Sequence, residues 1–180
     1  EVLHWPGVLA NAEIAPDQVR EDVARLAAQA VAELSQTRKR EGEKLAQVLG
    51  ERLESMAALV AQAQPLMPEV MKAYREKLSA RLAEAAAAPS DERIQQEVVF
   101  YAARIDVDEE LERLAAHVAE FRRVLGKGGA CGKRLDFLCQ ELNREANTLG
   151  SKSVSSDMTR ISVELKVLIE QMREQVQNIE

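Results

Sequence analysis

Two groups of charged side chains have a spacing that would suit chemistry on a phosphate. In the first, Glu110, Arg113 and His117 follow one another at steps of three and four residues, which places them on one face of a helix. Carboxylates bind divalent metals, and histidine can act as an acid, a base or a metal ligand near neutral pH. With a metal, such groups can generate a nucleophile and stabilise a charged phosphate.

The second group lies in the run GKRLDFLCQELNREANTLGSKS, residues 132–153. Glu141 and Glu145 are four residues apart, and Arg144 is three residues from Glu141, so these side chains also crowd one helix. A guanidinium can bind a phosphate through two hydrogen bonds. The ordinary alternative for both groups is a solvated face of salt bridges, and residue types alone favour that alternative.

The apolar pattern predicts the helices that must position these groups. Within residues 132–153 the apolar side chains recur at three- and four-residue steps, at Leu135, Leu138, Leu142, Ala146 and Leu149. Gly150 follows this stripe, and glycine is the usual residue of a left-handed helix end. The pattern therefore predicts an amphipathic helix that stops at Gly150.

The rest of the chain predicts an all-α fold of long helices in antiparallel hairpins. Its 180 residues contain 8 glycines, 5 prolines and only 3% aromatic residues, and no useful strand-like alternation is present. We expect a very long first helix from Pro16 to about Ala63, then helices over residues 69–87, 93–104 and 109–125. The last helix, from Met158, has a heptad-like apolar seam, which consists of Met158, Ile161, Leu165, Leu168 and Met172. Either another copy of the chain or another helix of the same chain would cover this seam.

Several other features limit the function classes. No apolar run is long enough to cross a membrane. Cys131 and Cys139 lack zinc-site spacing and predict free thiols in a reducing cytoplasm. The glycines of residues 126–129 lack the spacing of a phosphate-binding P-loop and predict a hinge. The net charge of −6 argues against broad nonspecific nucleic-acid binding. Small basic clusters could still follow a phosphate backbone, without interleaved aromatic residues for base stacking; they are Arg38, Lys39, Arg40, Arg122, Arg123, Lys133 and Arg134.

A long contiguous stretch resembles a known family. Residues 132–153, the terminal run MTRISVELKVLIEQMREQVQNIE and the upstream run RIDVDEELERLAAHVAEF are similar to the C-terminal domain of the YicC-like family of bacterial endoribonucleases. The resemblance implies metal-dependent cleavage of RNA by an oligomeric protein with a separate N-terminal domain. On that basis residues 1–15 are expected to be the lead-in from that domain, 16–88 a long helical hairpin region, and 89–180 the C-terminal helical domain with the family motifs.

The resemblance also gives the candidate residues expected roles. Metal binding or acid–base catalysis is expected of Glu110, His117, Glu141 and Glu145. Contacts to RNA phosphates are expected of Arg104, Arg113, Arg144 and Lys152. The expected cofactor is Mn²⁺ or Mg²⁺, and the expected partners are RNA and further copies of the chain, in the cytoplasm and without a membrane.

Two rival hypotheses remain open at this point. The long first helix and the heptad-like seam fit a non-enzymatic oligomerisation module. An RNA-binding adaptor that hands RNA to other nucleases would bind with a steep salt dependence and would not cut. Whether the 180 residues are active without the N-terminal domain is also left open.

Overall fold

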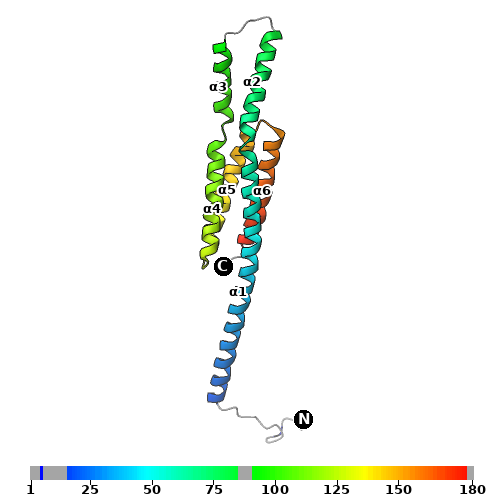
Figure 1. Cartoon of the computed structure of the whole chain (residues 1–180). Coiled ribbons are helices and arrows are strands. Elements are labelled where there is room, and N and C mark those ends of the chain that lie inside the picture. Colours follow the sequence, from blue (N-terminus) through cyan, green and yellow to red (C-terminus); the bar gives the residue numbers. More distant parts are fainter. Residues whose placement is uncertain (1–4, 6–15, 85–90, 178–180) are drawn as a thin grey trace. The chain divides into compact units, whose positions relative to one another are not determined.

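The computed structural model describes Trp5 and residues 16–84 and 91–177, and its regular structure in those ranges is entirely helical (Figure 1). The described helices are α1 Pro16–Ala63, α2 Leu66–Glu84, α3 Asp91–Ile105, α4 Asp108–Lys127, α5 Gly132–Lys152 and α6 Ser156–Val176. The predicted all-α class and the very long first helix are confirmed. Apart from Trp5, the predicted lead-in of residues 1–15 lies outside the described residues.

Internal contacts divide the chain into two units, residues 1–44 and 45–180. In the first unit the described part of α1 contains no buried residue, and its apolar side chains Val19, Val23, Leu26 and Leu34 are 43–59% exposed. The predicted division between residues 88 and 89 stays a prediction, because residues 85–90 are not described. Among the described helices none has the length and apolar character needed to span a bilayer.

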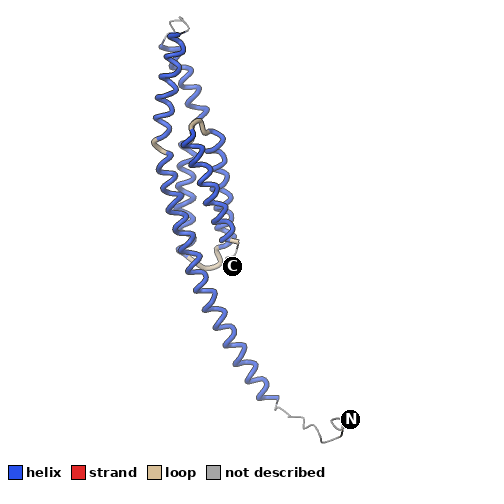
Figure 2. The backbone as a smooth tube through the Cα atoms, turned by 90° about the vertical axis from the view of Figure 1, so that its right-hand side faces the viewer, coloured by secondary structure: helices blue, strands red, loops and turns tan. Residues whose placement is uncertain are grey.

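The core of the second unit is built by residues 45–63 of α1 together with α4, α5 and α6. Figures 1 and 2 show α4, α5 and α6 side by side, while α2 and α3 pair with each other. Fully buried side chains from all four core elements meet in one cluster, among them Leu53, Leu114, Phe121, Leu142 and Leu165. Each contributes roughly 1.5–3 kcal/mol by leaving water. This cluster holds α4 and α5 against each other, and these two helices carry most of the candidate residues.

The seam of α6 is covered within the chain. Met158, Ile161, Leu165 and Met172 are buried as the spacing predicted, while Leu168 is only partly buried and Ile169 takes its place. The helix begins after Ser155, whose hydroxyl accepts a hydrogen bond from the Met158 amide at 3.2 Å. The intramolecular alternative for this seam is therefore the one observed.

The predicted end of α5 at Gly150 is wrong. The helix continues to Lys152 and is followed by Ser153 in extended conformation, with φ −65° and ψ 129°. Gly150 has a different reason to be glycine: a Cβ added there would lie 2.6 Å from the Ser162 hydroxyl oxygen of α6. Ser162 is buried and donates a hydrogen bond to the Ala146 carbonyl at 2.9 Å. The glycine thus permits close packing of α5 on α6.

We expect Gly150→Ala to lower the free energy of unfolding by about 1–3 kcal/mol, because Ser162 must move and its buried hydrogen bond weakens. The matched control is Gly50→Ala in α1, where no atom lies within 4 Å of the new Cβ. There the ordinary preference of helices for alanine is expected to raise stability by roughly 0.5–1 kcal/mol. Urea denaturation measures both. Equal shifts in the two variants would contradict this account of Gly150.

Candidate functional site

Arg113 of α4 is the centre of a charged network between α4 and α5. Its Nε donates a hydrogen bond to Glu145 Oε2 of α5 at 3.0 Å. Its terminal nitrogens pair with Glu109 and, at 3.5 Å, with Glu110 Oε1. Lys152 Nζ reaches the same Glu110 oxygen from the end of α5 at 2.9 Å. The fold therefore brings together four of the eight predicted site residues: Glu110, Arg113, Glu145 and Lys152.

Two carboxylates of this network, Glu110 and Glu145, are buried, and the cations lie at its rim. Glu110 is 3% exposed and Glu145 is 5% exposed, whereas the Arg113 and Lys152 side chains are 41% and 33% exposed. Buried charges need partners of opposite sign, and the two cations supply them. The hydrogen bond to Glu145 raises the pKa of Arg113 further above its already high value. Among the described residues, Glu110 Oε2 alone of these carboxylate oxygens is buried without a hydrogen-bond partner.

The last turn of α5 completes the network. Lys152 also donates a hydrogen bond to the Asp106 carbonyl at 2.8 Å, in the turn between α3 and α4. Asp106 Oδ1 in turn accepts a hydrogen bond from the Asp108 amide at 3.1 Å. Lys152 is the last residue of α5, so a helix that ended at Gly150 would not include the lysine that contacts Glu110. The same turn of helix that corrects the sequence prediction therefore brings a cation to Glu110.

His117 and Glu141 lie one helical turn farther along the same pair of helices. His117 is four residues after Arg113 on α4, and Glu141 is four residues before Glu145 on the antiparallel α5, a shift of about 6 Å on each. Both side chains are partly buried. Neither forms a hydrogen bond or ion pair with any residue that the structure describes. They differ in this from Glu110 and Glu145, whose charges are already matched by cations.

The remaining predicted residues stand apart. Arg144 and Arg104 are exposed, on α5 and α3, and within the described ranges their side chains have no ionic partner. Sequence reasoning had not selected Glu109 for the site. Its spacing of four residues from Arg113 was the available signal, since such pairs are neighbours on a helix.

The carboxylates do not form a metal-ligand set by themselves. Over residues 16–84 and 91–177, no group of three or more His, Cys, Asp or Glu side chains is arranged to hold a metal ion. Glu110 and Glu145 face Arg113 and Lys152 instead. The predicted role of Glu110, His117, Glu141 and Glu145 in metal binding remains a prediction.

A second ionic group lies toward the other end of the pair. Arg123 donates two hydrogen bonds to Glu120, at 2.7 and 2.8 Å, and Arg134 of α5 adds one at 3.4 Å. The hydrogen bonds from Arg123, followed by the nearby positive charge, lower the pKa of Glu120 from 4.5 to about 2. Glu120 therefore remains a carboxylate well below the pH at which an ordinary glutamate is protonated.

We expect the parent to gain stability over Glu120→Gln as the pH rises from about 2 to about 4.5, and the difference to stay constant above that. A depressed pKa in the folded state favours folding only while the group is charged, so the advantage disappears as the pH falls through the folded value. Denaturant midpoints of both proteins at a series of pH values measure it. A parent-to-variant difference that is the same at pH values below and above this window would contradict it.

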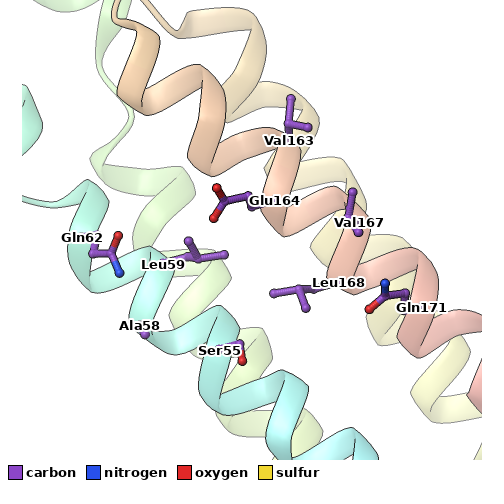
Figure 3. Close-up of a pocket in the computed structure, with 9 residues that line it drawn as sticks. All are labelled: Ser55, Ala58, Leu59, Gln62, Val163, Glu164, Val167, Leu168 and Gln171. Carbon is purple, nitrogen blue, oxygen red and sulfur yellow. The ribbon is translucent and has the colours of Figure 1, made fainter.

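An apolar groove of the second unit is not suited to phosphate. It measures about 530 Å³ and lies between α1 and α6, with Leu59, Val163 and Val167 in its wall (Figure 3). Its lining contains no Lys or Arg and one carboxylate, Glu164. The charged network between α4 and α5 is thus the better candidate for chemistry on a polyanion.

Comparisons with known proteins identify the family. Residues 63–180 match the family model described as "Endoribonuclease YicC-like, C-terminal". The chain is 46% identical over 180 residues to "Probable endoribonuclease YicC" of Haemophilus influenzae, covering all of this chain and 63% of that protein. It is 37% identical over 154 residues to the protein of the same name from Clostridioides difficile, covering 84% of this chain and 53% of that one. The chain thus spans less than two thirds of the length of these relatives. It belongs to the YicC-like endoribonuclease family, and its residues 63–180 correspond to that family's C-terminal region.

Proposed function

We propose that this protein cleaves RNA internally and that the chain contributes the C-terminal part of the enzyme. The observation that carries the proposal is the convergence of Glu110, Arg113, Glu145 and Lys152 between α4 and α5, with His117 and Glu141 one turn away. The names of the relatives support RNA as the substrate.

The proposed roles follow from which side chains are already engaged. Glu110 and Glu145 are buried and paired, so they hold Arg113 and Lys152 in position at the rim. A positioned guanidinium can bind a phosphate oxygen through two hydrogen bonds. His117 and Glu141 have no partner in the described structure, so they remain free for proton transfer at the reacting atoms. Arg144 and Arg104, both exposed, would contact the RNA backbone.

We also propose that cleavage requires Mg²⁺ or Mn²⁺. Such an ion would neutralise charge on the phosphate and lower the pKa of a bound water. Mg²⁺ is usually held by only one or two protein carboxylates together with waters and substrate phosphates. A site without a group of three protein ligands is therefore compatible with this requirement. Glu141 is the predicted metal-binding carboxylate that lacks a cation partner among the described residues.

The test is an RNA cleavage assay with structured RNA in Mg²⁺ or Mn²⁺, repeated with EDTA. The expected result is internal cleavage with metal and none with chelator. Because the chain spans less than two thirds of its relatives, the assay includes the protein at their full length. Absence of cleavage by that protein would overturn the proposed function, whereas cleavage that persists in EDTA would overturn only the metal requirement. Binding without cutting would favour the adaptor.

We propose further that the protein is a homo-oligomer in the cytoplasm. The apolar residues Val19, Val23, Leu26 and Leu34 recur along one side of α1 and are exposed, and such a stripe is ordinarily covered by a partner. Both cysteines are free thiols, as is usual in a reducing compartment. Light scattering of the parent and of Val23→Ser with Leu26→Ser tests the first point, and a monomeric parent would contradict it.

A further inference from the structure

The end of the α4–α5 pair away from the Arg113 network carries a dense group of cations. We call this surface the α4–α5 tip, and it consists of Arg122, Arg123, Lys127, Lys133, Arg134 and Phe137. All six side chains are exposed. Residues 121–137 contain these five cations and a single acidic residue, Asp136, a local charge of +4 in a chain whose net charge is −6. The positive charge is therefore concentrated here against the general trend of the molecule.

The nearby carboxylates are arranged to position cations. Glu120, on α4, accepts hydrogen bonds from Arg123 of the same helix and Arg134 of α5, which fixes these two guanidinium groups relative to each other. Asp136 faces Arg173 of α6 at 3.5 Å, so its charge is matched elsewhere. The other three cations, Arg122, Lys127 and Lys133, form no hydrogen bond or ion pair with any described residue. They are available to an external anion.

The beginning of α5 breaks the usual rules for a stable helix start. Its N-cap residue, Cys131, makes no side-chain hydrogen bond, and its first turn contains no acidic residue. Lys133 and Arg134 stand instead at the positive end of the helix dipole, where cations are unfavourable. A local arrangement that costs stability is often retained for a function. An anionic ligand would satisfy both the unpaired amides and the cations.

An exposed aromatic ring lies next to these cations. Phe137 is 46% exposed, and the Arg134 guanidinium carbon is 5.4 Å from the centre of its ring. The sequence had suggested that no aromatic residue accompanies the basic clusters, and for this cluster the structure corrects that expectation. Proteins that bind single-stranded nucleic acid combine a positively charged surface with aromatic rings on which bases stack. Charge alone would suit any polyanion, whereas an exposed ring beside a guanidinium also offers a surface on which a base can stack.

We propose that the α4–α5 tip binds single-stranded RNA, with the cations on backbone phosphates and Phe137 stacked on a base. This proposal depends on the proposed function, because it takes RNA to be the substrate. Lys127 is 10 residues from His117 on α4, a distance of about 15 Å along the helix. The tip therefore anchors the RNA strand away from the reacting phosphate. It contributes to KM and does not take part in the chemical step.

The first experiment measures binding of a fluorescent oligouridylate in EDTA over a range of salt concentrations, using the protein at its relatives' full length. The triple variant Arg122→Gln, Lys127→Gln, Lys133→Gln removes the three cations that have no partner. Each phosphate contact contributes roughly 0.7 to the salt slope on single strands, so the slope is expected to fall by about 2 and affinity at about 0.1 M salt by roughly 10- to 100-fold. The control with the same charge change is Lys72→Gln, Lys77→Gln, Arg81→Gln on α2, and it is expected to bind like the parent.

A second variant, Phe137→Ala, tests stacking without changing the charge. Loss of one stacked base is expected to weaken binding by roughly 5- to 150-fold and to leave the salt slope unchanged. In the triple, the loss of Lys127 from the last turn of α4 and the loss of Lys133 from the first turn of α5 act on the helix dipoles in opposite directions, so little change in the thermal midpoint is expected. Phe137→Ala removes a half-buried ring, so a modest fall in its thermal midpoint is expected. Parent-like binding by the tip triple, or an equal loss in the α2 control, would overturn the proposal. Binding to phosphatidylserine vesicles is measured for the same variants. If the tip triple loses vesicle binding but keeps its affinity for oligouridylate, the tip is a membrane-binding surface and the proposal is overturned.

The kinetic readout separates this proposal from the proposed function. With a cleaving parent, the tip triple is expected to raise KM and keep kcat, and a fall in kcat at unchanged KM would overturn the anchoring role. If the parent binds oligouridylate through the tip and cuts no RNA, the binding site stands while the proposed cleavage fails.

Discussion

His117→Ala is expected to lower the rate of RNA cleavage by about 10²- to 10⁴-fold and to change the free energy of unfolding by less than about 0.5 kcal/mol. The rate loss follows from the proposed proton-transfer role of the imidazole. The small stability change follows from the structure, because His117 forms no hydrogen bond or ion pair with a described residue and is only partly buried. Single-turnover cleavage at saturating RNA, together with urea denaturation, measures both quantities.

The matched control for this variant is Glu112→Ala on the same helix. Glu112 is exposed, and no ion pair is formed by its side chain in the described structure. It is expected to cleave RNA at the parent's rate. Glu141→Gln, on the facing helix, should resemble His117→Ala if the two groups act on the same phosphate. Parent-like cleavage by both His117→Ala and Glu141→Gln would remove these residues from the site, even if the protein is a nuclease.

The helices were predictable because their signals are local. Apolar steps of three and four residues identified the buried faces of α4, α5 and α6, and the paucity of glycine and proline predicted the uninterrupted α1. The pairing of Glu110 with Arg113 followed from the same spacing. Such patterns are fixed by the period of the helix and need no knowledge of the rest of the fold.

The charged network itself was not predictable in its contacts. Arg113 and Glu145 are 32 residues apart, and Glu110 and Lys152 are 42 residues apart, so only the packing of α4 on α5 brings them together. Gly150 was misread for a related reason. A glycine after an apolar stripe is typical of a helix end, whereas the cause here is the hydroxyl of Ser162 on another helix. Local propensity cannot distinguish a cap from a close tertiary contact.

One physical requirement connects the fold and the proposed chemistry. The cations offered to phosphate at the rim of the network are held by carboxylates that are themselves buried between two helices. Removing a cation therefore affects the fold as well as the site, since it strands a buried negative charge. Variants of Arg113 and Lys152 must be assayed for stability before any loss of cleavage is assigned to the chemistry.

Lys152→Met is expected to lower the free energy of unfolding by about 3 kcal/mol. Lys152 is the closest cation to the buried Glu110, at 2.9 Å, and without it only Arg113 remains, at 3.5 Å. The other oxygen of Glu110 is already buried without a hydrogen-bond partner in the described structure. Methionine keeps the aliphatic length of lysine, so the loss reports mainly on the charge. Urea denaturation measures it, with exposed Lys166→Met on α6 as the control, for which less than about 0.5 kcal/mol is expected.

The double variant Glu110→Gln, Lys152→Met decides why the single variant is unstable. If the cost is an unmatched buried charge, neutralising Glu110 should recover much of it, and the two substitutions should show a coupling of at least about 1 kcal/mol. If instead Lys152 acts mainly by donating to the Asp106 carbonyl, the double variant stays as unstable as Lys152→Met alone. A third outcome, full stability of Lys152→Met with loss of cleavage, would mean that Glu110 does not depend on this lysine and that Lys152 serves the RNA directly.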